Sequence, residues 1–62
     1  MSAIIVKHLC AQLASNTAVE IINHLDCDLF FEGSVADIPP ELLFLDVVKF
    51  QTQNNRYILF VS

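Results

Sequence analysis

The sequence predicts a small α+β domain in the order α-β-β-α-β-β, with an N-terminal helix and two β-hairpins joined by a short crossover helix. The chain has 62 residues, the length of one domain with one core, so we expect residues 1–62 to form a single domain. Apolar residues recur with a helical period near the N-terminus, and four later runs have the short apolar or alternating pattern of strands. We expect these strands to form an antiparallel sheet.

Residues 3–14 predict an amphipathic helix. Ile5, Leu9 and Leu13 recur at every fourth position, whereas Lys7 falls elsewhere on the helical wheel. Lys7 lies inside the apolar segment rather than before it, which is not the order of a secretory signal. We therefore expect this segment to belong to the mature fold.

Residues 17–23 (TAVEIIN) and 29–33 (LFFEG) predict the first hairpin, because both are rich in β-branched or aromatic residues. The connecting residues 24–28 include two aspartates, whose carboxylates can accept hydrogen bonds from the nearby backbone. Alternation along the second strand places Leu29 and Phe31 on one face of the sheet.

Residues 31–43 (FEGSVADIPPELL) contain the only glycine and both prolines of the chain. We expect Gly33 to end a strand where a side chain would hinder the bend, and Asp37 to cap a short helix that begins near Pro39 and Pro40. Proline is tolerated in a first helical turn, where its missing N–H would be unpaired anyway. The stretch is interpreted as a structural joint, since a phosphate-binding loop would need more glycines.

Residues 47–53 (VVKFQTQ) and 56–61 (RYILFV) predict the second hairpin. Residues 54–55 are both asparagine, which tolerates the positive φ of a tight hairpin turn. Alternation predicts that Val47 and Lys49 share one face of the sheet.

The charge balance disfavours nucleic acid as a partner. The net charge is −4, from seven acids against Lys7, Lys49 and Arg56, which leaves too few cations to follow a phosphate backbone. No stretch approaches the roughly 18 consecutive apolar residues of a membrane span. Cys10 and Cys27 form no C-x-x-C pair, so we expect reduced, buried thiols in a cytoplasmic protein.

The sequence contains no recognisable catalytic or cofactor motif. His24, Asp26 and Asp28 are spaced by two around a predicted turn and could converge on a divalent cation, but a turn of acids is ordinarily solvated. His8 and Cys10 lie two apart on the predicted helix, so they do not face each other as a nucleophile pair would. We expect no enzyme activity, no catalytic residue, no metal and no cofactor.

Both faces of the predicted strands are apolar, and a short helix with a two-turn crossover cannot cover both. A second copy of the chain is the natural cover, so we expect a homodimer or larger assembly. The leading candidates for its interface are Phe30, Phe50, Ile58 and Phe60.

The second hairpin also suggests a ligand site. Lys49 and Arg56 are two of the three cations, Asn54 and Asn55 add amide donors, and Tyr57 offers a ring for stacking on a base. Doubled by symmetry, these residues could line a pocket at a subunit interface. Alternatively, the two cations keep a solvated strand pair soluble.

The order of these elements resembles that of short, poorly characterised proteins from phages and Gram-positive bacteria, which share an F-E-G-x-x-x-D-I-P-x-E-L-L core. The similarity runs from about residue 17 onward. In the usual form an acid directly follows the single proline, whereas here Pro40 takes that place and Glu41 comes one residue later. That change weakens a capping box with Asp37.

The resemblance implies a phage or mobile-element setting, and with it a location in the cytoplasm of a bacterial host. We therefore expect a non-enzymatic, acidic homo-oligomer that inhibits or modulates a host protein, such as a defence protein, by direct binding. One alternative is a protein that sequesters a small phosphorylated or nucleotide signal at a subunit interface. Another is a structural or assembly subunit.

Overall fold

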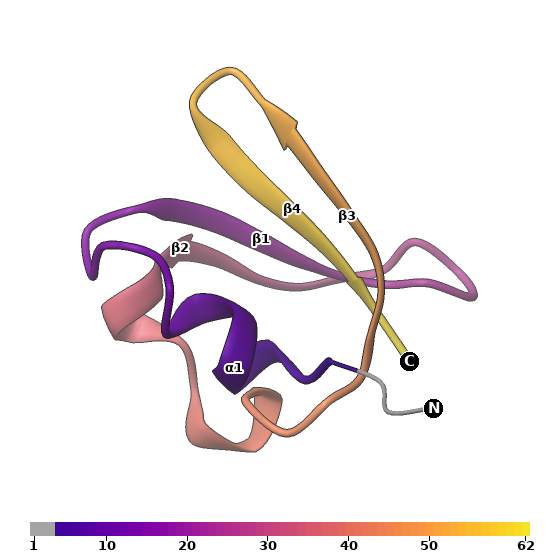
Figure 1. Cartoon of the computed structure of the whole chain (residues 1–62). Coiled ribbons are helices and arrows are strands. Elements are labelled where there is room, and N and C mark those ends of the chain that lie inside the picture. The colour runs from indigo at the N-terminus through magenta and orange to yellow at the C-terminus, as the bar shows by residue number, and fades with distance from the viewer. Residues whose placement is uncertain (1–3) are drawn as a thin grey trace.

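The computed structural model describes residues 4–62 as a four-stranded mixed sheet with one short helix beneath it (Figure 1). The elements in chain order are α1 (Val6–Cys10), β1 (Ala18–Asn23), β2 (Leu29–Ser34), the 3-10 turns η1 (Val35–Asp37) and η2 (Pro40–Leu42), β3 (Val47–Gln53) and β4 (Arg56–Val61). The α+β class is confirmed, and so are the four predicted strands.

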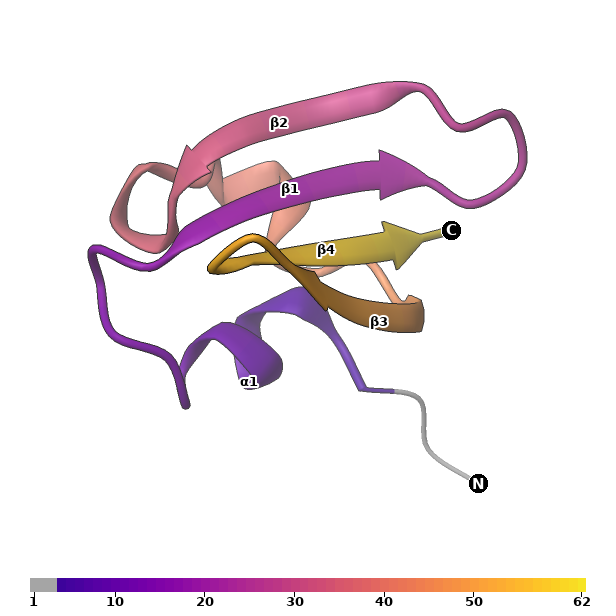
Figure 2. The same cartoon turned by 90° about the horizontal axis from the view of Figure 1, so that it is seen from above.

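The prediction of a wholly antiparallel sheet is wrong, because the sheet is mixed. Its strand order is β2-β1-β4-β3, with antiparallel pairs at both edges and a parallel pair, β1 with β4, at the centre (Figure 2). The physical reason is burial. β1 and β4 contain the most buried residues of the four strands, whereas β3 is polar and exposed along most of its length. The observed order puts the two apolar strands inside and the polar strand at an edge.

Helix α1 is much shorter than the predicted helix over residues 3–14. Before it, Ile4 and Ile5 lie beside the start of β3: the carbonyl oxygen of Ile4 accepts a hydrogen bond from the N–H of Val47, 2.8 Å away. After it, the N–H of Leu13 bonds to the carbonyl of Cys10, three residues back, which tightens the chain into a turn. Ala3, where the predicted helix begins, lies outside the described residues.

The crossover is two separate 3-10 turns rather than one helix, and Asp37 does not cap either of them. The residue preceding η2 is Pro39, and no side chain caps the turn. Asp37 is instead the last residue of η1, and its carboxylate accepts a hydrogen bond from the hydroxyl of Ser34 at 3.0 Å. The residue that follows, Ile38, has extended backbone angles, which interrupts the helical path before the prolines.

Gly33 does not end its strand, because β2 continues to Ser34. Its role is close packing instead. A Cβ atom at Gly33 would lie 2.9 Å from Cζ of Phe31, so the missing side chain leaves room for that ring to fold over the strand. Phe31 packs against the buried core from there.

Each edge strand contains a β-bulge that overrides simple alternation. In β2, Phe31 pairs with Ile21 but Leu29 pairs with Ile22, so Phe30 is an extra residue. In β3, Val47 pairs with Val61 but Lys49 pairs with Phe60, so Val48 is the extra residue. Val47 therefore packs toward the core while Lys49 does not, and the expectation that they share a face is wrong.

The core lies between the sheet and the segments beneath it. Val19, Ile21, Leu59 and Val61 from the two central strands are almost fully buried, and Val6 and Cys10 of α1 pack against them with Ile38 of the crossover. α1 and the crossover thus cover the same side of the sheet (Figure 1).

Candidate functional site

The other side of the sheet carries no covering element among residues 4–62 (Figure 2). We call this side the open face. Its side chains alternate with those of the core along each strand. They include Glu20, Ile22, Leu29, Phe30, Glu32, Lys49, Gln51, Gln53, Arg56, Ile58 and Phe60.

The apolar part of the open face lies toward the turn between β1 and β2. Ile22 of β1 pairs with Phe60 of β4 on one side and with Leu29 of β2 on the other. The bulge also brings Phe30 to this position, and Leu29 and Phe30 are 54% and 45% exposed. The bulge therefore presents two large apolar side chains where a regular strand would present one.

The four residues predicted for an oligomer interface do not share one face. Phe30 and Phe60 lie on the open face, as does Ile58, but Ile58 is only 8% exposed and offers little surface. Phe50 pairs with the core residue Leu59 and so lies on the opposite side of the sheet. There it remains 43% exposed and stacks on Tyr57, with ring centroids 5.3 Å apart and planes at 13°.

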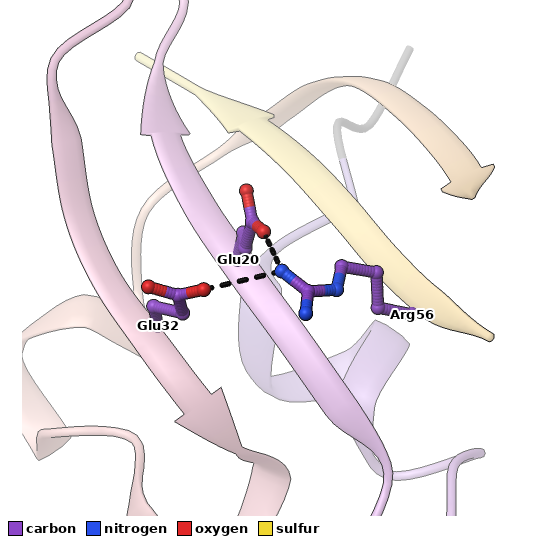
Figure 3. A network of polar contacts seen from close by, with 3 residues as sticks. All are labelled: Glu20, Glu32 and Arg56. Atoms are coloured by element: carbon purple, nitrogen blue, oxygen red, sulfur yellow. Dashed lines mark hydrogen bonds and ion pairs between the residues drawn. The ribbon is translucent and has the colours of Figure 1, made fainter. Parts of the chain in front are cut away.

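The other end of the open face holds a charged cluster formed by Glu20, Glu32 and Arg56 (Figure 3). One guanidinium nitrogen of Arg56 donates to both carboxylates, to Glu20 at close range and to Glu32 at 3.1 Å. Hydrogen bonding to Glu20 is the main reason that the pKa of Arg56 is raised above its ordinary value. The glutamate pair is adjacent in the β1–β2 ladder, so Arg56 relieves repulsion between two like charges.

The predicted ligand residues are brought together only in part. Asn54, Asn55, Arg56 and Tyr57 line an open hollow of about 460 Å³ at the tip of the second hairpin. Lys49 does not line it. The Lys49 ammonium nitrogen instead lies 5.6 Å from the ring centroid of Phe60, in a cation–π arrangement on the open face.

This geometry gives little support for a phosphate ligand at the hairpin tip. Arg56 is the one cation that lines the hollow within the part of the chain that the structure describes. Its charge is already shared by two carboxylates, so the cluster has a local net charge of −1. An incoming phosphate would meet two negative charges at its only cationic partner.

The side chains of the first hairpin turn stabilise the turn itself. The carboxylate of Asp26 accepts a hydrogen bond from the N–H of Asp28, and the amide oxygen of Asn23 accepts one from the N–H of Leu25. His24, Asp26 and Asp28 do not form a metal-ligand cluster, and no such group of three occurs within residues 4–62.

The two cysteines have different environments. Cys10 is buried, and burial raises the pKa of its thiol. Cys27 is exposed, contrary to expectation, at a turn position where its φ of 62° is in the left-handed region.

The described residues include no helix that is long and apolar enough to cross a membrane.

Comparison with protein-family models, with curated proteins and with solved structures found no match to this chain. The resemblance to short phage and Gram-positive proteins therefore stays a prediction.

Sequence reasoning did not identify the charged cluster or Leu29 as parts of the site. An acid in each strand of the first predicted hairpin was a usable signal, because the register places Glu20 opposite Glu32. Arg56 was predicted as a ligand residue, but no signal placed it beside Glu20, because that contact depends on the parallel pairing of β1 with β4. The exposure of Leu29 depends on the bulge.

Proposed function

We propose that the chain is a non-enzymatic binding protein of phage or mobile-element type, which modulates a host protein by direct contact through the open face. The observation that carries this proposal is the group of large apolar side chains there, the exposed Leu29 and Phe30 with the partly buried Phe60, beside a charged cluster. Aromatic anchors with charged groups at the margin are typical of protein–protein contact surfaces.

Charge favours a partner with basic groups. The chain as a whole has a net charge of −4. On the open face, the Glu20–Glu32–Arg56 cluster has one excess negative charge, and Lys49 supplies one positive charge beside Phe60. The overall negative charge of the chain attracts a basic partner from a distance, and the separate negative and positive sites on the open face fix its orientation on contact. Self-association is part of the proposal, because the chain has further exposed apolar residues outside the open face, among them Phe50.

The first prediction tests the open face directly. The protein and its Phe30→Ser variant are purified from the cells that naturally produce it and examined by native mass spectrometry. We expect a co-purified protein with the wild type and its loss with Phe30→Ser, because serine removes the exposed aromatic anchor.

Phe44→Ser is the matched control. Phe44 is 64% exposed but lies in the segment before β3, near Lys7 rather than on the open face. A partner lost equally from both variants would contradict the proposal, and so would a wild-type protein that retains no partner. A retained nucleotide or phosphorylated small molecule would favour the sequestering function instead.

A further inference from the structure

Strand β3 is an edge strand, and no other strand within residues 4–62 pairs with its outer side (Figures 1 and 2). Six of its seven residues are exposed, all except Val47. Within residues 4–62, the residue that bonds to this side is Ile4, whose carbonyl oxygen accepts a hydrogen bond from the N–H of Val47 at the beginning of the strand. Among residues 4–62, no other backbone group bonds to the outer side of this strand, and such an edge readily accepts another strand.

The turn determines which of these backbone groups point outward. Asn54 and Asn55 both have positive φ, 52° and 65°, as in the two-residue turn that suits the twist of a hairpin. In such a turn the flanking residues, here Gln53 and Arg56, form a hydrogen-bonded pair. Hydrogen-bonded and non-bonded pairs alternate along the ladder, so Thr52 and Phe50 belong to non-bonded pairs. Their N–H and C=O groups therefore point away from β4.

Charge distinguishes the two edges of the sheet. β2, at the other edge, carries Glu32 beside Glu20, so two copies of β2 would bring like charges together. β3 and its turn, residues 47–55, contain one charged side chain, Lys49, and no acid. The seven acids of the chain therefore lie elsewhere, and β3 is the edge at which two copies of an acidic protein can meet.

We propose that β3 pairs antiparallel with β3 of a second copy, with the two-fold axis at Phe50. This inference rests on the self-association included in the proposed function. The register places Phe50 opposite the partner's Phe50 and Lys49 opposite the partner's Gln51. A register centred on Lys49 would instead oppose two ammonium groups.

Aromatic contact supports this register. Phe50 already stacks on Tyr57 within one copy. Pairing at Phe50 joins the two stacks into a row of four rings across the seam, and it covers a side chain that is 43% exposed in the single chain. The two four-stranded sheets become continuous, and a two-fold axis normal to the sheet puts both open faces on the same side. The pair therefore presents a doubled binding surface to its partner protein.

The second prediction is tested with opposite charges at Gln51, which is exposed and lies on the open face opposite Ile58. Gln51→Glu places a carboxylate opposite the partner's Lys49 twice in the dimer, whereas Gln51→Lys places two ammonium groups there. In sedimentation equilibrium at low salt, we expect the dimer Kd to fall by about two- to thirty-fold for Gln51→Glu and to rise by a similar factor for Gln51→Lys. Both changes should shrink in 1 M salt.

Gln53→Glu is the control, because it adds the same charge on the same face of the same strand but faces Val47 of the partner in the proposed register. We expect it to leave the dimer Kd within about twofold of the wild type. If Gln53→Glu tightens the dimer and Gln51→Glu does not, the register is centred on Gln51 and the proposed register is wrong. If neither charge at Gln51 alters the Kd, β3 pairing is overturned.

The outcomes separate this inference from the proposed function. If the dimer Kd does not change with the charge at Gln51 but the dimer dissociates in Phe30→Ser, the dimer forms through the open face. Self-association is then supported, and β3 pairing is overturned. A wild-type protein that is monomeric at all concentrations overturns both β3 pairing and self-association, while partner binding is judged by the Phe30 and Phe44 variants alone.

Discussion

Asp37 shows how a short polar side chain can satisfy more than one local hydrogen-bond pattern. Its position before Ile38-Pro39-Pro40 resembles a helix N-cap, but its carboxylate accepts from Ser34 three residues earlier. Aspartate commonly bonds to nearby groups in turns, which makes the two roles hard to distinguish from sequence. Through the hydrogen bond from Ser34, Asp37 stabilises the connection between β2 and β3.

The third prediction follows from that hydrogen bond. Asp37→Ala should lower the free energy of unfolding by roughly 0.5–1 kcal/mol. The charge on the acceptor strengthens this hydrogen bond, whereas its exposure to solvent weakens it. Chemical denaturation of Asp37→Ala, Ser34→Ala and the double variant measures it. We expect the double variant to lose little more than either single one. Additive losses would mean that the two side chains act independently.

At the scale of the elements, the β3–β4 hairpin is specified by its turn. Asn54 and Asn55 both adopt positive φ, which costs most residues about 1–2 kcal/mol but asparagine less. The same turn sets the register of Gln53 against Arg56 and therefore which backbone groups of β3 face outward. A two-residue signal thus determines the geometry of a whole edge strand.

The fourth prediction concerns Asn55, whose φ is 65°. Asn55→Gly should maintain or raise the thermal midpoint, because Asn-Gly is the preferred pair for this turn. Asn55→Ala should lower the free energy of unfolding by about 1 kcal/mol, since alanine is strained at positive φ. Thermal melts followed by circular dichroism measure both. A midpoint unchanged in Asn55→Ala would show that the turn adopts another conformation in solution.

At the scale of the whole molecule, one side of the sheet is covered and the other is not. α1 and the crossover bury Val19, Ile21, Leu59 and Val61, and a chain of 62 residues has no further described element to lay over the open face. Domains of this size bury a smaller fraction of their surface than larger domains do and are correspondingly marginal in stability. Association is therefore expected to contribute to folding stability.

The fifth prediction tests that contribution. If the dimer stabilises the folded chain, the thermal midpoint should rise with protein concentration, as for any ligand that binds only the folded state. Calorimetry over a hundredfold range of concentration measures the shift. Thr52→Pro should remove the dependence, because it deletes an outward N–H of β3 while leaving the bonds to β4. A midpoint independent of concentration in the wild type would show that the chain is stable alone.

The sequence by itself determined where the strands lie. β3 and β4 have the bounds that were predicted, and β1 and β2 differ from prediction by one residue at one end. The Asn54–Asn55 turn is also as predicted. These features depend on side-chain alternation, β-branched content and turn residues within a few positions of one another, so a local pattern is sufficient to specify them.

Only the tertiary structure decided the strand order, the bulges and the composition of the open face. Pairing β1 with β4 joins segments far apart in the chain, and it is selected because it buries the two most apolar strands at once. The Glu20–Arg56 contact and the exposure of Leu29 follow from that pairing and from the bulge opposite Ile22. Competition among all possible pairings for burial is a property of the whole chain, and no short window of sequence contains it.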